Sequence, residues 1–283
     1  MAVQILVDSA SDFDMEELKE KNIICVPLTI TFGENHYKDC FELSKDKFYE
    51  KLLEKKDYPM TSQPSPEDFL KHFLAAKERG DSVVAILMSS GVSGTCQSAN
   101  IAKEMAKYDE IHIVDSKTLV TAIRVLVEKA LEMRGEGKSA AEIAETLERL
   151  KHRVKIYAAI DTLEYLCKGG RVTKAQAGVG DLVRLKPMIT LNEKGTVDIW
   201  GKSVGSKKAM NQLLAKMEDI ELDKAYEFRF AYTHDRGNSE KLKEMFVDKG
   251  YEVKDAKLYN IGSTVGSHTG SGAFGFVCVE AEK

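Results

Sequence analysis

The residues best suited to hold a ligand lie in short polar loops that directly follow apolar runs. The apolar run Val83–Met88 leads into Ser89–Thr95, with the sequence SSGVSGT, and two other apolar runs lead into the sequences DSASD and DS. Hydroxyl groups and glycine offer neutral hydrogen-bond donors and room for a ligand to approach the backbone. If the runs are parallel strands, their carboxyl ends meet at the sheet edge where ligands bind. Ser9 and Ser116 would then join the loop at one site.

The loop Ser89–Thr95 precedes a predicted helix, and this position suits an anion. Free backbone N–H groups and the helix dipole attract negative charge there, and Ser93, Gly94 and Thr95 would supply hydroxyl and backbone donors. The structural explanation is that Ser93 or Thr95 caps the helix and the glycines make a tight turn. That explanation is favoured for one isolated loop, whereas three such loops on one edge favour a ligand.

The loop matches neither common nucleotide motifs nor the usual hydrolase motif. It contains no GxxxxGK[ST] or GxGxxG sequence, and Gly91-Val-Ser-Gly differs from the GxSxG nucleophile elbow. A Ser93 nucleophile with His268 as its base stays open as an alternative, although their spacing gives it little support.

Two further segments are rich in hydroxyl groups or glycine. Thr61 and Ser62 open the sequence TSQPSP, for which a turn and a helix cap are the ordinary explanation. His268 and Thr269 lie in GSTVGSHTGSGAFG, a predicted loop whose glycines indicate unusual backbone angles or a close contact. Arg171 follows two glycines that fit a helix end, and is either a surface charge or an anchor between domains.

The order of predicted elements indicates an α/β protein with two domains. In residues 1–153, apolar strands alternate with amphipathic helices, which is typical of a mostly parallel sheet flanked by helices. Ser65 and Ser139 each begin a sequence that favours a helix start. Residues 154–283 mix strands with three helices, which indicates an α+β domain. The predicted strands there are 156–160, 187–191, 196–200, 228–233, 251–258 and 274–279, and the predicted helices are 173–185, 207–220 and 239–249.

Composition argues against several classes of protein. The net charge of −4 over 283 residues speaks against a nucleic-acid partner. The five cysteines are odd in number, lack a CxxC pair and are scattered, so we expect free thiols in a reducing compartment and no metal site. No apolar stretch approaches the length of a membrane span, and the N-terminus lacks the features of a signal peptide. A cytoplasmic protein is expected.

Six motifs together resemble the DegV family. They are DSASD (8–12), TSQPSP (61–66), SSGVSGT (89–95), DS (115–116), DTLEYLCKGGRV (161–172) and VGSHTGSGAFG (265–275). Each motif alone is weak, but six in the family's order are specific, and the resemblance covers about residues 3–282.

The resemblance implies a non-catalytic lipid-binding subunit of a bacterial fatty acid kinase system, which serves phospholipid metabolism. It implies that a long-chain fatty acid such as palmitate or oleate lies between the two domains. The positions matching Thr61 and Ser93 would hold the carboxyl group, with His268 in the same network. A separate ATP-dependent kinase would phosphorylate that carboxyl to acyl phosphate, and no cofactor is expected.

Two departures from the family's pattern concern the partner and one loop. Ser271 stands where the family has proline, and an arginine expected near Val204 is missing. Lys202 and Lys207 keep this segment basic and are the candidate docking residues, although a solvated helix start explains them equally well. The alternatives left open are a serine hydrolase or acyl transferase using Ser93 and His268, and a lipid-responsive regulator.

Overall fold

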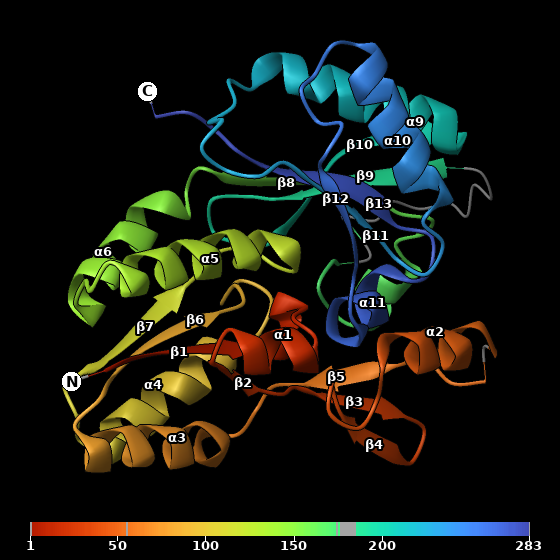
Figure 1. Cartoon of the computed structure of the whole chain (residues 1–283). Coiled ribbons are helices and arrows are strands. Elements are labelled where there is room, and N and C mark those ends of the chain that lie inside the picture. The colour runs from red at the N-terminus through yellow and green to blue at the C-terminus, as the bar shows by residue number, and fades with distance from the viewer. Residues whose placement is uncertain (1, 55, 174, 176–184, 283) are drawn as a thin grey trace.

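The computed structural model describes residues 2–54, 56–173, 175 and 185–282. The described residues form three sheets of four, six and three strands. Figure 1 shows the four-stranded and six-stranded sheets as separate layers with helices between and outside them. This arrangement confirms the predicted fold class, a parallel sheet flanked by helices together with a second sheet unit.

The four-stranded sheet is parallel throughout and is covered on both faces. Side chains alternate between its faces: Leu6 and Ala85 belong to the core under two helices, whereas Ile5 and Val84 belong to the core under two others. This double burial explains why the strands are continuous apolar runs. In spatial order the strands are β2 (Ile23–Val26), β1 (Val3–Asp8), β6 (Ser82–Leu87) and β7 (Ile111–Asp115). The covering helices are α3 (Pro66–Arg79) and α4 (Thr95–Ala106) on one face, and α5 (Thr121–Gly135) and α6 (Ala140–Leu150) on the other.

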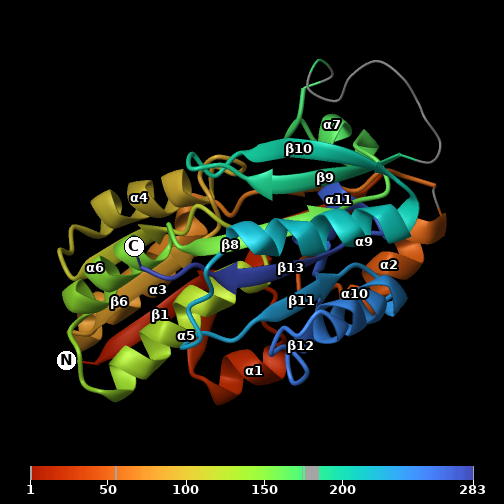
Figure 2. The same cartoon turned by 90° about the horizontal axis from the view of Figure 1, so that it is seen from above.

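The six-stranded sheet is antiparallel except for its last pair of strands. Its strands in spatial order are β10 (Val197–Val204), β9 (Leu185–Leu191), β8 (Val154–Ala159), β13 (Phe274–Val279), β11 (Arg229–Tyr232) and β12 (Lys257–Asn260). Two helices, α9 (Gly205–Lys216) and α10 (Gly237–Asp248), cover its outer face, and Figure 2 shows them lying over the sheet. Phe246 of α10 packs on Phe230 and Phe276 of the strands beneath it.

The small sheet lies beside the gap between the two larger sheets. It consists of β4 (Asn35–Lys38), β3 (Thr29–Phe32) and β5 (Met60–Ser62), and its neighbours include α2 (Lys45–Glu54), α7 (Glu164–Lys168) and α11 (Ser263–Thr269). Helix α1 (Met15–Glu20) connects β1 with β2 of the parallel sheet. The stretch 23–32 is β-rich but interrupted by Pro27, which predicts a break there. Pro27 separates β2 from β3, and these two strands belong to different sheets. A proline lacks the N–H needed to continue a sheet ladder, which accounts for the break.

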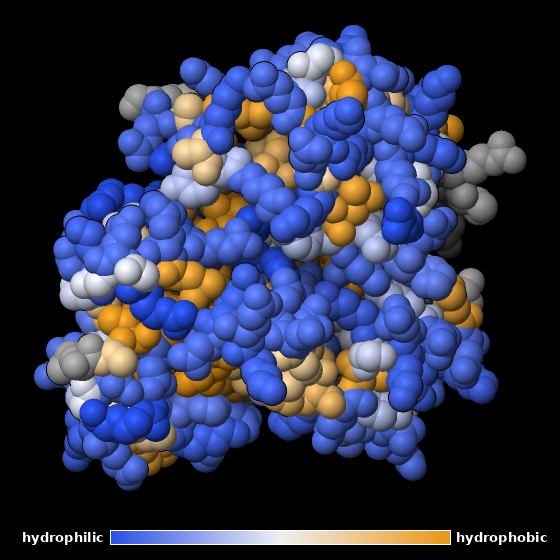
Figure 3. Space-filling model, viewed as in Figure 1, coloured by the Kyte–Doolittle hydropathy of each residue, from blue (hydrophilic) through white to orange (hydrophobic). Residues whose placement is uncertain are grey.

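One hydrophobic core joins the two larger sheets. Helix α5 contacts the parallel sheet on one side and strands β8 and β13 on the other. Val7 and Ile86 of the parallel sheet therefore share a continuous apolar cluster with Val277 and Val279 of the six-stranded sheet. On the face seen in Figure 3, hydrophilic side chains predominate and hydrophobic ones form small separate patches, because most large apolar residues are inside.

Several predicted boundaries differ from the structure. The sequence predicts a helix over 117–134, whereas α5 begins at Thr121, because Lys117 and Val120 have positive φ angles (54° and 50°) that interrupt a helix. Residues 263–269, expected as a loop, form α11, and the strand expected at 251–258 is Lys257–Asn260. The helix predicted at 173–185 falls mostly outside the described residues.

Candidate functional site

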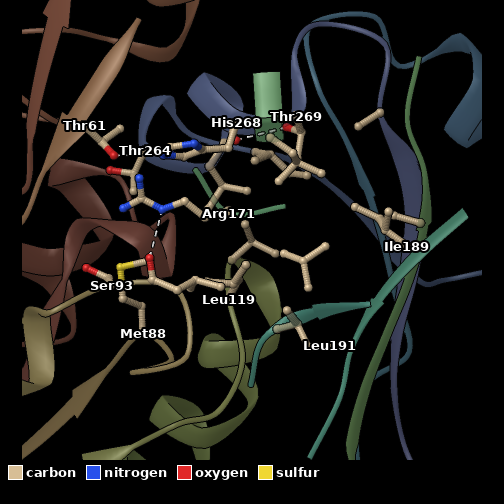
Figure 4. Close-up of a pocket in the computed structure, with 18 of the residues that line it drawn as sticks. Thr61, Met88, Ser93, Leu119, Arg171, Ile189, Leu191, Thr264, His268 and Thr269 are labelled. Carbon is tan, nitrogen blue, oxygen red and sulfur yellow. Dashed lines mark hydrogen bonds between the residues drawn. The ribbon is translucent and has the colours of Figure 1, made fainter. Parts of the chain in front are cut away.

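An apolar cavity of about 280 Å³ lies between the two larger sheets. Ile156, Ala158 and Ile189 of the six-stranded sheet form one wall, and Met88 and Leu119 lie on the opposite side (Figure 4). This volume is close to the lower end of the range for small-molecule sites, about 300–1,000 Å³. The cavity suits an apolar molecule, since most of its lining is aliphatic.

Polar side chains gather at one end of this cavity. Thr61 comes from β5, Ser93 from the loop after β6, Arg171 from the segment after α7 and His268 from α11. In Figure 4 these side chains lie at the same end, away from Ile189 and Leu191. The sequence predicted Thr61, Ser93 and His268 at a common site, and the structure brings them together although they are far apart along the chain.

His268 is buried and is joined to Thr61. Its Nε2 atom lies 2.8 Å from Thr61 Oγ1, and only 9% of the residue is exposed. Burial, with a smaller contribution from the nearby positive charge of Arg171, lowers the pKa of His268 to about 4. The ring is therefore neutral at pH 7, and its Nδ1 atom has no hydrogen-bond partner among the described residues.

Ser93 is bonded within its own loop. Its hydroxyl lies 2.8 Å from Thr95 Oγ1 and accepts a hydrogen bond from Thr95 N at 3.3 Å. The cap residue of α4 is Gly94, which has no side chain to bond the helix, so Ser93 satisfies one helix N–H from the preceding position. Among the described residues no base is hydrogen-bonded to the Ser93 hydroxyl, and His268 bonds Thr61 instead. A hydroxyl without a base is a poor nucleophile, which weakens the hydrolase alternative.

Arg171 ties the end of α7 to the loop that carries Ser93. Its Nε donates to Val92 O at 3.0 Å, and its Nη1 donates to Gly169 O at 2.5 Å. Partial burial lowers the pKa of Arg171, and a guanidinium remains charged under these conditions. The side chain places a positive charge beside Thr61 and Ser93 (Figure 4), where an anionic head group would be stabilised.

A buried acidic cluster supports the loops around the polar end. Asp8 accepts hydrogen bonds from Met88 N (2.7 Å) and Ala10 N (2.9 Å), and Asp12 accepts one from Gly262 N (2.8 Å). Thr264, which lines the cavity, donates to Asp39 at 2.5 Å. Burial raises the pKa of Asp8 to about 7 and that of Asp12 to about 6, and also raises the pKa of Asp39. These carboxylates join the strand ends to α11.

Four of the remaining predicted residues line the cavity or shape the loop that carries Ser93. Ser62 and Thr269 line the cavity, although the Thr269 hydroxyl donates to Val265 O within α11. Thr95 is fully buried behind Ser93. Gly94 leaves room for the side chain of Gln63, which a methyl group at Gly94 would overlap.

Ser9 and Ser116 do not line the cavity. Ser9 Oγ accepts from Leu28 N at 3.1 Å and lies 3.5 Å from Thr264 Oγ1. Ser116 donates to Thr118 O at 3.2 Å, which stabilises the turn before α5. Lys202 and Lys207 are exposed on β10 and α9, away from the cavity.

Sequence reasoning missed Gln63, Thr264 and the acids Asp8, Asp12 and Asp39 as parts of this region. Asp8 and Asp12 flank Ser9 in a motif that was considered, so a signal was available at those two positions. Thr264 likewise lies in the glycine-rich segment GSTVGSHTGSGAFG. Asp39 carries no comparable signal, because only burial and the approach of α11 to β3 bring it to Thr264.

The described residues lack a membrane-spanning helix and a metal-binding group. None of their helices is long and apolar enough to span a membrane, and their His, Cys, Asp and Glu side chains include no group arranged to hold a metal ion.

Comparison with known proteins identifies the family. Residues 2–281 match the family model described as "Uncharacterised protein, DegV family". A DegV domain-containing protein of Caldanaerobacter subterraneus is 34% identical over 275 residues, which cover 96% of this chain and 97% of that protein. Protein DegV of Bacillus subtilis is 30% identical over 278 residues, which cover 97% and 98% of the two chains.

Solved structures show the same fold. A DegV family protein from Thermus thermophilus, described with fatty acid binding, superposes with a TM-score of 0.88 at 31% identity over 99% of this chain and all of that one. DegV from Bacillus subtilis, described as a fatty acid binding protein, gives a TM-score of 0.82 at 29% identity over 99% and 100% of the two chains. With the family model and these relatives covering nearly its whole length, the chain belongs to the DegV family.

Proposed function

We propose that this protein binds one long-chain fatty acid in the cavity between the two larger sheets and presents its carboxyl group to a separate kinase. The single observation that carries the proposal is the form of the cavity, whose aliphatic lining ends in hydroxyl groups, a neutral histidine and an arginine. The aliphatic lining suits an acyl chain, and the polar end suits a carboxyl group. The relatives described as fatty acid binding proteins support the same ligand.

The acyl chain provides most of the binding free energy. Each buried methylene contributes about 0.8 kcal/mol, so a chain of about fourteen supplies on the order of 11 kcal/mol before the costs of association. The head group then needs mainly to be oriented. Palmitate or oleate is the class of ligand that this balance favours.

Four side chains are proposed to hold the carboxyl group: Thr61, Ser93, Arg171 and His268. Thr61 and Ser93 supply hydroxyl groups, Arg171 supplies positive charge, and His268 orients Thr61. Ser62 and Thr269 line the same end, and Gly94 and Thr95 shape the loop around Ser93. Ser9 and Ser116 are proposed to act indirectly, through the loops that they stabilise.

Presentation requires that another protein reach the head group. Ser62, beside Thr61 at the cavity, is exposed, so the polar end lies near the surface. We place the docking surface at Lys202 and Lys207, which are exposed where β10 leads into α9 and would face an acidic patch on the kinase. We further propose that the protein is cytoplasmic, needs no cofactor and catalyses no reaction alone.

Reconstitution tests this presentation role. Fatty acid, ATP and the protein are incubated with and without a cognate fatty acid kinase, and acyl phosphate is measured. Product is expected only in the complete mixture. Charge reversal at Lys202 and Lys207 is expected to slow the reaction while leaving lipid binding intact. Ester hydrolysis or ATP turnover by this protein alone, abolished by Ser93→Ala, would contradict the proposal.

A further inference from the structure

The end of α7 presses against the imidazole ring of His268. Gly169 follows the last residue of α7 with ordinary helical angles (φ −73°, ψ −10°), so its backbone does not require glycine. A methyl group at Gly169 would nevertheless overlap the Nδ1 atom of His268 and lie 2.6 Å from its Cε1 atom. Glycine is needed at this position because of the ring that lies against it.

Contacts from both sides hold α7 in this place. Tyr58 packs on Tyr165 with ring centroids 5.5 Å apart, and its hydroxyl donates to Glu164 Oε1 at 2.7 Å. Lys168 Nζ lies 3.0 Å from the centroid of the Tyr58 ring. On the other side, Gly270 at the end of α11 lies so close to the Tyr165 ring that a methyl group there would be 2.9 Å from it. Gly169 is therefore fixed against His268 by the packing of α7.

The surroundings of the ring decide which nitrogen carries its proton. Nε2 has a partner, Thr61 Oγ1, at 2.8 Å, whereas Nδ1 is buried and has none among the described residues. Buried N–H groups without an acceptor are rarer in proteins than acceptors without a donor. Gly169 lies against Nδ1 and has no side chain that could accept a hydrogen bond from it. The low pKa of His268, set by burial and then by Arg171, excludes a second proton at pH 7.

We propose that Gly169 is a positioning residue that holds His268 as the Nε2–H tautomer, so that the ring donates to Thr61 and the Thr61 hydroxyl donates into the cavity. This inference rests on the proposed function for the identity of the ligand, and it adds how the head group is recognised. Thr61 and Arg171 then both offer hydrogen-bond donors, which favours an ionised carboxylate, a pure acceptor, over a long-chain ammonium, which has only donors.

The first test measures the tautomer directly in the ligand-free protein. Histidine is labelled with ¹⁵N, and the His268 signals are identified among the six histidines by their loss in His268→Gln. At pH 7 the long-range ¹H–¹⁵N couplings are expected to show a neutral ring protonated at Nε2. A ring protonated at Nδ1, or a charged ring, overturns the proposal. Because the protein is unchanged at Gly169, this test holds even if a Gly169 variant fails to fold.

The second test measures the coupling between Gly169 and His268. Gly169→Ala and His268→Ala are each expected to weaken fatty acid binding by about 5- to 150-fold, which corresponds to one lost hydrogen bond in a buried network. In the double variant the methyl group occupies the space of the missing ring, so Gly169→Ala is expected to add almost nothing. Fully additive effects overturn the role of Gly169.

A neighbouring glycine provides the control. Gly170 has a left-handed φ of 75° and open space around its Cα, so Gly170→Ala strains the backbone without touching His268. It is expected to leave the His268 signals in place, whereas Gly169→Ala moves them. Equal shifts in both variants would contradict the inference. Absence of fatty acid binding by the unchanged protein would refute the proposed function, while the tautomer would still decide this inference.

Discussion

Thr61 and Ser93 lie at the same end of the cavity but have different partners. Thr61 is bonded to a buried neutral ring, whereas Ser93 is bonded to Thr95 at the start of α4. A ligand carboxylate that accepts from Ser93 replaces or shares this local bond. The two hydroxyl groups therefore contribute through different mechanisms, and substitutions at each can be distinguished.

Ser93→Ala tests whether Ser93 does more than stabilise its helix. Loss of a hydrogen-bonding partner from a buried site costs about 1–3 kcal/mol, so binding of palmitate is expected to weaken by this amount, with a much smaller effect on an alkane-like probe of equal length. Isothermal titration of the delipidated protein measures both. Ser90→Ala is the matched control, because Ser90 is exposed in the same loop and does not line the cavity. Equal losses for both ligands would show that Ser93 only caps the helix.

Asp8 makes stability depend on pH in a defined direction. Its pKa is raised to about 7 in the folded protein from 3.8, so between these values the folded state holds a proton that the unfolded state releases. Stability conferred by Asp8 is therefore greatest at low pH and falls as pH rises toward 7, on the order of 1 kcal/mol per pH unit.

Urea unfolding at pH 5, 6 and 7 measures this effect against Asp8→Asn, which cannot titrate. The free energy of unfolding of the unchanged protein minus that of Asp8→Asn is expected to decrease with pH. His268 acts in the opposite direction, since its lowered pKa favours the folded state as pH rises from 4 to 6.5. Because His268 is present in both proteins, its contribution cancels in the difference between their free energies of unfolding. A difference that grows with pH would contradict the burial of Asp8.

At the scale of elements, the sequence predicted regular structure well where local signals decide it. Helices begin after Ser65 and Ser139 as predicted, each with a capping box, and the buried parallel strands follow their apolar runs. The sequence predicts a turn where β5 lies, because three residues become a strand only by pairing with β3. The glycine-rich sequence predicts a loop where α11 lies, because glycine disfavours a helix, whereas in the structure these glycines allow close contacts with other elements. Gly266, for example, leaves room for the rings of Phe48 and Tyr49.

The residues of the site also divide into those that local sequence identifies and those that tertiary contacts identify. Thr61, Ser93 and His268 could be chosen from their motifs and from the family resemblance. The roles of Gly169, Asp39 and Thr264 could not, because each depends on the approach of segments that are distant in sequence. Local chemistry identifies candidate residues, whereas tertiary packing decides which of them share a site.

The turn between β9 and β10 is fitted against the loop that carries Ser93. Ser89 Oγ donates to Gly195 O at 2.8 Å, and a methyl group at Gly195 would overlap that hydroxyl. Gly195→Ala is expected to destabilise the protein by about 1 kcal/mol for its left-handed angle and by a further amount for the clash. Thermal unfolding measures the sum.

Gly250→Ala is the matched control for that turn. Gly250 also has a left-handed angle (φ 89°) but has nothing within 4 Å of the added methyl group, so it carries the backbone cost alone. The difference between the two variants isolates the contact between the turn and Ser89. Equal destabilisation would show that the two segments can separate freely.

At the scale of the whole molecule, the shared core links the two sheet units. We propose that residues 1–153 and 154–283 are the two domains, with α5 packed between their sheets. Because one apolar cluster includes residues of both, we expect a single cooperative unfolding transition. Far-UV circular dichroism reports the whole chain, and Trp200 fluorescence reports β10, because Trp200 is the only tryptophan. Two separate midpoints would contradict this coupling.

Native mass spectrometry of the purified protein, followed by extraction of its ligand, tests the central proposal most directly. The cavity is expected to hold one long-chain fatty acid per chain, released on denaturation and regained when palmitate or oleate is added to the delipidated protein. The acyl chain identified in the extract would also show which chain lengths the aliphatic wall accepts. Protein that carries no acyl chain after purification, and that fails to bind either fatty acid when it is added, would contradict the account.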